Sequence, residues 1–401
     1  MVFAATAVSN ALVYLAIIAA SRSLGPAEYG IVGAMIGAIV ILTVPSLSLQ
    51  TLAAREAAAL RSRGDATGVA GVHRRRLRQA VLFGAVATAL AAAFSEPISR
   101  LLNFPDLWPV LLTAFAAAPI LVTSETRGVL QGQERYGPLC LNLIVEGVVR
   151  LAAVAVALAA GWGATGVCAA PAIGTAASAA AGLWALRGLA RPEGAARAAL
   201  TAVWATGAFY AGYAALTNID VVVAKQSFSD VDAGHYAAAA IFGKVVLLLP
   251  LAVGIVLLPR VAAAAEEGRR GFRLLARALV LVVGACGAVT LVGYLAPHAI
   301  TLVTVGSEYV DAEDLYGPYG VAMLGFAVVA ILVLFNLAHG RPVTAWACLV
   351  AAPVQFALMA LVADTGTELI WTMVGAAAAI AAIGAAEAAL TPRRPPAAPP
   401  P

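Results

Sequence analysis

Val2–Ala20, with the sequence VFAATAVSNALVYLAIIAA, is a predominantly apolar stretch without a charged side chain. A run of about 20 such residues is long enough to cross the ~30 Å hydrocarbon core of a bilayer as a helix. No charged leader precedes the run and no small-residue cleavage site follows it, so we expect a first membrane span rather than a removed signal.

Composition extends this conclusion to the whole chain. Of the 401 residues, 62% are hydrophobic and only 11% are charged, whereas soluble domains carry roughly a quarter charged residues. Too few polar groups are present to solvate a soluble surface or to neutralise nucleic-acid phosphates. We therefore exclude a soluble enzyme, a disordered chain and a nucleic-acid-binding protein, and we predict that lipid surrounds most of the chain.

Apolar runs of membrane length recur throughout the sequence. Cutting them at clusters of charged residues, Pro and Gly predicts an all-α polytopic membrane protein with about 12 transmembrane helices. The spans are expected at 2–20, 30–54, 79–97, 108–128, 138–160, 164–187, 200–224, 234–258, 274–296, 316–338, 342–363 and 369–390.

Basic residues indicate the orientation of these spans, because Lys and Arg are retained in cytoplasmic loops. With a cytoplasmic N-terminus, 20 of the 25 Lys and Arg residues lie on cytoplasmic connections, and three, Arg22, Arg100 and Lys225, lie on outer ones. The remaining two, Arg150 and Lys244, fall within spans. The sequence therefore predicts that both termini are cytoplasmic.

The two halves of the sequence repeat each other at an offset of about 205 residues. Ser23–Gly30 is followed by an apolar run that contains Pro45, and Ser227–Gly234 by an apolar run that contains Pro250. An arginine stands ten residues after each of these prolines. Because each copy holds six spans, both copies enter the membrane in the same direction, as in parallel-repeat transporters.

This repeat predicts the domain organisation. We expect two six-helix lobes, at 1–199 and 200–390, that enclose a cavity at their seam, and a disordered Pro-rich tail at 391–401. Proline removes a backbone donor and permits a helix to bend. Pro45 and Pro250 are therefore candidate hinges for alternating access, with fixed kinks as the alternative.

Ionisable residues inside the spans are candidate functional groups, because each costs about 2.5–3.5 kcal/mol at a helix centre and tends to face a cavity. Glu146 and Arg150 are four residues apart in one span, where they can pair or line a polar cavity. Asp220 and Lys244 lie in neighbouring spans, and the sequence leaves open whether they couple transport to a cation or proton or form a structural pair. Glu125 is a further candidate for coupling.

Other polar residues and motifs add less. Arg22, at the outer edge of the first span, either anchors headgroups or meets an anionic substrate at the mouth of the cavity, and Asn218 adds polar lining. Gly161–Gly166 fits G-x-G-x-x-G but joins two spans, which argues against a nucleotide site. The four cysteines show no CxxC spacing and the four histidines are separate, so we expect no metal or other cofactor, and no catalytic triad points to an enzyme.

Several short motifs also resemble those of a known family. The resemblance rests on the stretch SRSLGPAEYG at 21–30, LQGQERY at 130–136, NID at 218–220, DAGHYAA at 232–238 and LPR at 258–260. Their order resembles that of bacterial polysaccharide-export flippases, which belong to the multidrug, oligosaccharidyl-lipid and polysaccharide flippase superfamily. The resemblance covers nearly the whole chain.

The resemblance implies two six-helix lobes in a V and a function in lipid-linked glycan transport. We expect a flippase in the cytoplasmic membrane of a bacterium that moves a polyprenyl-diphosphate-linked oligosaccharide to the outer leaflet, in concert with a polymerase and glycosyltransferases, and with H⁺ or Na⁺ as a coupling ion. Arg22, Arg150 and Lys244 would attract the diphosphate. The alternatives are a multidrug or organic-cation antiporter of the same superfamily, a non-transporting membrane scaffold and a membrane glycosyltransferase.

Overall fold

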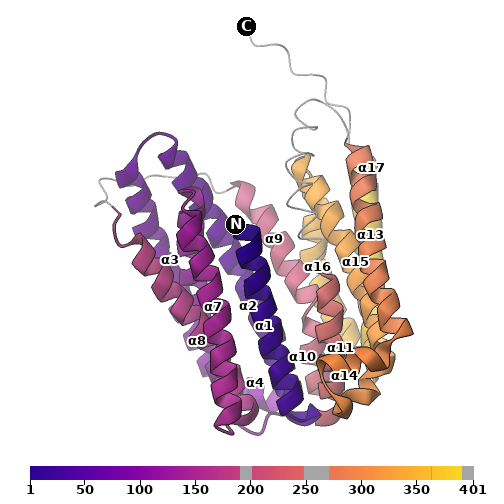
Figure 1. Cartoon of the computed structure of the whole chain (residues 1–401). Helices are drawn as coiled ribbons and strands as arrows, with labels where there is room; N and C mark the ends of the chain where they lie inside the picture. Colours follow the sequence, from indigo (N-terminus) through magenta and orange to yellow (C-terminus); the bar gives the residue numbers. More distant parts are fainter. Residues whose placement is uncertain (190–200, 248–270, 363, 391–401) are drawn as a thin grey trace. The chain divides into compact units, whose positions relative to one another are not determined.

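The computed structural model describes residues 1–189, 201–247, 271–362 and 364–390, and the regular secondary structure of these residues is entirely helical (Figure 1). The chain separates into two compact units, Met1–Gly207 and Ala208–Pro401. The proposed tail and Pro250 lie outside the described residues.

Residues 1–189, the described part of the first unit before α9, form six long and two short helices. In this unit α1 packs on α7, α2 on α6, and α7 on α8. Figure 1 shows the short helix α4 at the opposite end of this unit from the N-terminus. The helices are α1 (Val2–Ser23), α2 (Pro26–Arg61), α3 (Ala66–Ala93), α4 (Ser95–Leu101), α5 (Trp108–Ala114), α6 (Ala117–Gly132), α7 (Tyr136–Ala159) and α8 (Gly163–Leu186).

The described elements of the second unit repeat part of this order. A short helix, α14, follows the long helix α13 just as α4 follows α3, and three further long helices complete both units. The described elements are α9 (Thr201–Leu216), which begins before the boundary between the units, α10 (Ile219–Ser227), α11 (Asp230–Val246), α13 (Phe272–Leu295), α14 (Pro297–Thr304), the 3-10 helix η1 (Ser307–Ala312), α15 (Glu313–Ala338), α16 (Val343–Val362) and α17 (Gly366–Ala389).

The helices confirm an all-α polytopic membrane fold. Within the described residues, ten helical segments are long and apolar enough to cross a membrane. The two predicted spans that are not among them, at 200–224 and 234–258, fall on a broken helix and on a helix that leaves the described residues after Leu247.

The expected span at 200–224 is divided into two helices, α9 and α10, with a break at Thr217 and Asn218. Thr217 donates its hydroxyl to the carbonyl of Tyr213 at 2.8 Å, and Asn218 donates its side-chain amide to the carbonyl of Ala214 at 2.9 Å. Such local side-chain bonds compete with the backbone pattern of a helix. At the break, the carbonyl of Leu216 accepts a hydrogen bond from the side chain of Gln355 on α16.

The second and third spans are longer than the sequence predicted. Both helices continue past the apolar runs into the arginine-rich segment, where Ala57 and Leu60 of α2 pack with Val69 and Val72 of α3 in a buried cluster. The carboxylate of Asp65 caps α3, accepting the backbone N–H of Gly68 at 2.7 Å. The apolar contacts and the cap together sustain a helical hairpin beyond the membrane-length runs.

Small residues bring α6 close to α2. A Cβ atom at Gly128 would lie 2.4 Å from the carbonyl oxygen of Gln50, and one at Gly132 would lie 2.4 Å from that of Ala54. No larger residue fits at these distances, and membrane helices commonly use small residues for such close contacts. This contact positions the carboxyl end of α6, which carries the central arginine of the site described below.

Candidate functional site

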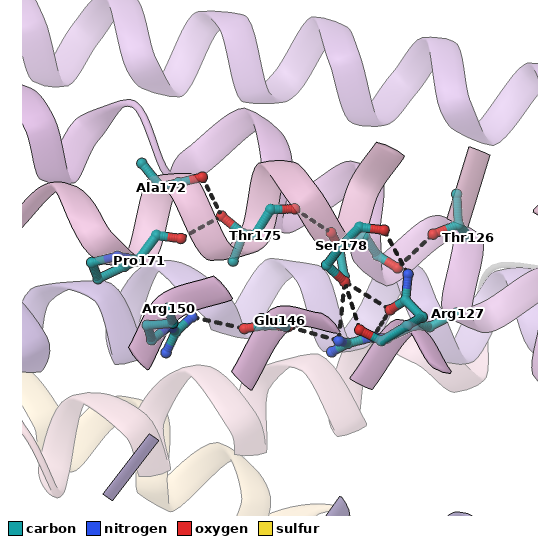
Figure 2. A network of polar contacts seen from close by, with 10 residues as sticks. Thr126, Arg127, Glu146, Arg150, Pro171, Ala172, Thr175 and Ser178 are labelled. Atoms are coloured by element: carbon teal, nitrogen blue, oxygen red, sulfur yellow. Dashed lines mark hydrogen bonds and ion pairs between the residues drawn. The ribbon is translucent and has the colours of Figure 1, made fainter. Parts of the chain in front are cut away.

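A polar network joins α6, α7 and α8 inside the first unit (Figure 2). Arg127 of α6 donates to the side-chain oxygen of Asn142 at 2.6 Å, to the carboxylate of Glu146 at 2.6 Å and to the hydroxyl of Ser178 at 3.2 Å. Arg150, one turn after Glu146 on α7, donates to the other carboxylate oxygen at 2.7 Å. The expected Glu146–Arg150 pair therefore forms, but Arg127 shares the same carboxylate.

Local sequence explains why these three helices approach so closely. A Cβ atom at Gly182 would lie 2.3 Å from the hydroxyl oxygen of Thr126, and one at Gly174 would lie 3.0 Å from the Cβ of Arg150. The side-chain amide of Asn142 donates to the carbonyl of Ser178 at 2.6 Å, which ties α7 to α8. The glycines of α8 thus provide the space in which the polar side chains meet.

The charges of this network do not balance. Arg127 and Arg150 contribute two positive charges, and Glu146 contributes one negative charge. These three side chains are only 15–17% exposed, and Nε of Arg150 is buried with no hydrogen-bond partner among the described residues. A buried guanidinium with an unused donor is a favourable site for an anionic oxygen, since phosphate and carboxylate oxygens match its geometry.

A second charged group lies between α3 and α6 in the same unit. Glu125, which is fully buried, receives a contact from Nδ1 of His73 at 2.9 Å to one carboxylate oxygen and 3.2 Å to the other. Nearby, Glu56 of α2 binds Arg75 at 2.8 Å and Arg76 at 2.5 Å. Glu125 therefore belongs to a separate pair from the Arg127 network.

In the second unit, residues at the helix break and on α16 carry buried acceptor oxygens. Gln355 of α16 donates its side-chain amide to the carbonyl of Leu216, the last residue of α9, at 2.9 Å. The side-chain oxygens Oε1 of Gln355 and Oδ1 of Asn218 are buried and have no donor among the described residues. The break thus leaves acceptors that an additional cation or proton-bearing group can satisfy.

Asp220 lies in the first turn of α10, directly after this break. Its Oδ2 atom accepts hydrogen bonds from the hydroxyls of Tyr319 at 2.6 Å and Tyr236 at 3.0 Å, while Oδ1 is buried without a partner in the described part of the chain. Lys244 lies within electrostatic reach of Asp220, but in the described residues the two form no ion pair. The tyrosines, and not a lysine contact, hold this carboxylate.

The remaining predicted site residues are Arg22, Pro45 and Pro250. Arg22 is exposed in the last turn of α1. Pro45 lies within α2, which continues from Pro26 to Arg61, and its repeat-related counterpart Pro250 lies outside the described residues. The roles expected for Arg22 as a substrate contact and for the prolines as hinges stay predictions.

Comparison with known proteins identifies the family. A family described as polysaccharide biosynthesis protein matches residues 1–264, about two thirds of the chain. The chain belongs to this family. The expected resemblance to the multidrug, oligosaccharidyl-lipid and polysaccharide flippase (MOP) superfamily is thereby confirmed.

Two relatives of this polysaccharide biosynthesis family protein come from Mycobacterium tuberculosis. They are the uncharacterized proteins Rv1510 of strain H37Rv and MT1558/MT1560 of strain CDC 1551. Each is 31% identical over 347 residues, which cover 82% of this chain and 76% of the relative.

Solved structures show the same fold. An inward-facing multidrug resistance MATE family transporter of the MOP superfamily has a TM-score of 0.77 at 13% identity, with 96% of this chain and 94% of that chain covered. A MOP superfamily transporter from Pyrococcus furiosus has a TM-score of 0.60 at 12% identity, with 97% and 94% covered. The family protein therefore has the two-lobed fold of MOP superfamily transporters.

Several residues of these groups were not predicted as site residues. Arg127 was assigned to a cytoplasmic connection because it stands at the end of the predicted fourth span, although its spacing from Glu125 places it on the same helix. Ser178 and Gln355 are uncharged residues in apolar spans, and His73 stands in an arginine-rich connection. A polar residue deep in an apolar run, as at Gln355, is the signal that could have identified that position.

Proposed function

We propose that this protein flips a polyprenyl-diphosphate-linked oligosaccharide from the inner to the outer leaflet of the bacterial cytoplasmic membrane. Family membership supports a role in polysaccharide biosynthesis, and the fold is that of MOP superfamily transporters. The observation that carries the proposal is the unbalanced positive charge of the Arg127–Glu146–Arg150 network, together with the unused Nε donor of Arg150.

The chemistry of this network suits a diphosphate. Glu146 fixes both guanidinium groups, so their donors are already oriented before a substrate arrives. A phosphate oxygen that accepts from Arg150 would satisfy the unused donor and offset the excess charge. A neutral substrate would do neither, and an organic cation would be repelled.

The second unit supplies the coupling step in this proposal. Asp220, with Asn218 and Gln355, offers buried oxygens that lack donors in the described structure, and such oxygens favour H⁺ or a small cation such as Na⁺. Entry of a cation would alter the bonds of Tyr236 and Tyr319 to Asp220. Lys244, within electrostatic reach, would compete with the cation for the same carboxylate.

A vesicle assay tests the flippase proposal. Purified protein is reconstituted with a fluorescent polyprenyl-diphosphate glycan, and arrival in the outer leaflet is measured with an impermeant quencher. The wild type should accelerate flipping, and Arg150→Met should slow it by about 10- to 150-fold, the loss of one charge-assisted hydrogen bond of ~1.5–3 kcal/mol. Arg100→Met, which removes an exposed arginine paired with Glu96, is the matched control and should leave the rate unchanged.

Two outcomes contradict the flippase proposal. One is a wild-type protein that gives no acceleration over empty vesicles although it is folded. The other is an Arg150→Met variant that flips the glycan at the wild-type rate, because the anion site would then play no part.

A separate variant tests coupling. In Asp220→Asn, transport should proceed at the same rate with and without a Na⁺ or H⁺ gradient, whereas the wild type should respond to one of the two gradients. Asp311→Asn changes an exposed carboxylate and is the control. A gradient response that survives in Asp220→Asn would place the coupling group elsewhere, with Glu125 and His73 as the next candidates.

A multidrug or organic-cation antiporter is the second candidate function. The observation in its favour is the donor-poor group at Asp220, which would accept a cationic substrate as readily as an inorganic cation. Cation-driven export of a fluorescent organic cation by wild type, together with no effect of Arg150→Met, would support this candidate over the flippase.

The remaining expectations are part of the same proposal. A lipid-linked glycan flippase works beside a polymerase and glycosyltransferases, and we propose the same partners here. We also propose that both termini are cytoplasmic, that a V-shaped cavity between the lobes admits the glycan headgroup, and that Pro45 and Pro250 serve as hinges.

A further inference from the structure

An arginine-rich helical hairpin at one end of the first unit is not used by the proposed transport mechanism. It comprises the last turns of α2 and the first turns of α3, joined at Ser62–Asp65. At 1.5 Å per residue, the 36 residues of α2 extend over roughly 54 Å, more than the ~40–45 Å of a bilayer with its headgroups. Part of the hairpin must therefore stand outside the hydrocarbon.

The exposed side chains of α3 locate the boundary of the hydrocarbon. Val81, Leu82 and Phe83 are 50–62% exposed, as expected for side chains in contact with lipid. Arg78 and Arg74, one and two turns earlier, are exposed as well. The change from arginine to large apolar side chains within three residues places Arg78 at the level of the phospholipid headgroups.

Buried ion pairs show which part of α2 lies beside this part of α3. Glu56 of α2 binds Arg75 and Arg76 of α3 at 2.8 and 2.5 Å, which fixes the two helices side by side at this height. Arg55, next to Glu56 in the sequence, is exposed. Arg55 of α2 therefore stands at about the same height as Arg74 and Arg78 of α3.

The charge of these three arginines is not compensated within the described structure. None of Arg55, Arg74 and Arg78 forms an ion pair with another described residue, whereas Arg61 at the tip pairs with Glu134 at 2.8 Å. The carboxylate of Glu56 is engaged by Arg75 and Arg76. An anion from outside the chain is the available partner for this row of guanidinium groups.

Buried apolar contacts hold the hairpin in place, so the guanidinium groups of Arg55, Arg74 and Arg78 have a defined arrangement. Its apolar side packs in one buried cluster with the ends of α6, α7 and α8, through Val129, Leu139 and Leu186. We propose that Arg55, Arg74 and Arg78 form a binding surface for the phosphate headgroups of anionic phospholipids in the adjoining leaflet. Basic residues just outside a transmembrane helix bind such headgroups electrostatically, and here they come from two helices.

This surface is distinct from the Arg127–Glu146–Arg150 network, and its existence does not depend on transport. The phosphates of a lipid-linked glycan share the chemistry of phospholipid headgroups. Phospholipids are the source favoured here, because the row lies at the perimeter beside lipid-facing side chains and not among the buried polar residues of α6 to α8.

Lipid binding by the full-length protein tests the proposal. Purified protein in a neutral detergent is titrated with phosphatidylglycerol or phosphatidylcholine, and bound lipid is counted by native mass spectrometry. The wild type should bind phosphatidylglycerol at least tenfold more tightly, and the preference should fall as salt rises. The triple variant R55Q/R74Q/R78Q should bind phosphatidylglycerol about 100-fold more weakly than the wild type. At ~1.4 kcal/mol per factor of ten, this is a loss of ~3 kcal/mol in binding free energy, as expected when three basic residues near an anionic surface are removed.

Matched variants keep the test decisive. Arg100→Gln removes an exposed arginine from the opposite end of the first unit and should bind phosphatidylglycerol like the wild type. If the triple variant does not fold, R74Q/R78Q should still lose about tenfold or more. Equal affinity of wild type and variants, no preference over phosphatidylcholine, or a loss confined to a polyprenyl diphosphate probe would each overturn the proposal.

Discussion

The unequal bonding of Arg127 and Arg150 leads to a quantitative prediction about stability. Arg127 donates three hydrogen bonds, to Asn142, Glu146 and Ser178, whereas Arg150 donates one, to Glu146. Replacing Arg127 by Met should therefore destabilise the protein far more than replacing Arg150 by Met. The two substitutions remove the same charge from neighbouring helices, so each is the control for the other.

The magnitude follows from the number of bonds lost. Polar contacts between membrane helices contribute on average ~0.6 kcal/mol and at most ~1.7 kcal/mol each, so three contacts give about 2–5 kcal/mol for Arg127→Met. Breaking a buried ion pair gives a similar ~3–5 kcal/mol. In Arg150→Met, Glu146 keeps its bond to Arg127 at 2.6 Å. The free energy of unfolding should therefore fall by less than about 1.7 kcal/mol.

Reversible unfolding of purified protein in mixed micelles measures both values. The expected order is wild type, then Arg150→Met slightly less stable, then Arg127→Met clearly less stable. Equal losses in the two variants, or a larger loss in Arg150→Met, would show that the described hydrogen bonds do not determine the stability of the α6–α7–α8 packing.

Three further predictions concern single positions. Gly182→Ala would place a Cβ atom 2.3 Å from the hydroxyl oxygen of Thr126. This overpacking should lower the free energy of unfolding by about 1–3 kcal/mol, measured in the same unfolding assay. Unchanged stability would contradict the close contact. Glu387→Gln should lower the free energy of unfolding by about 1–3 kcal/mol, because the Glu387 carboxylate accepts the backbone N–H groups of Val343 and Thr344 at the start of α16, at 2.9 and 2.8 Å. A melting temperature equal to that of the wild type would argue against a stabilising role of these two bonds. The stabilisation that the cap of α3 provides should depend on pH. The hydrogen bond from the backbone N–H of Gly68 lowers the pKa of Asp65 in the folded protein below its ordinary 3.8. The cap should therefore stabilise the fold fully above pH 3.8 and lose this effect as the pH falls through the pKa of Asp65 in the folded protein. Asp65→Asn should then weaken the pH dependence of the melting temperature below pH 3.8, and identical profiles would refute this.

Much of the fold follows from the sequence because lipid imposes a simple rule on it. Apolar runs of membrane length predicted the helices α7, α8, α13 and α17 closely. The predicted spans did not include either end of α2 or the first turns of α3. Hydropathy indicates where a helix leaves the membrane, but it does not indicate where the helix ends. Helix continuation there depends on apolar packing within the hairpin and on the cap at Asp65.

The site was predictable only where its residues are close in sequence. The spacing of four between Glu146 and Arg150 showed that the two residues could pair, with a polar cavity wall as the alternative, and the pair forms. The partners Arg127 and Ser178 come from other helices, and their meeting depends on the glycines of α8. Likewise, the tyrosines that hold Asp220 are 16 and 99 residues away, distances at which helical periodicity gives no information.

The location of lipid-linked glycan in living cells tests the central claim most directly. A strain that lacks this protein is complemented with wild type, Arg150→Met or Arg100→Met at matched protein levels, and polyprenyl-diphosphate glycan on the inner leaflet is quantified. We predict that this glycan builds up in the deletion strain and with Arg150→Met, and returns to normal with wild type and Arg100→Met. Equal amounts of inner-leaflet glycan in all four strains would contradict the account.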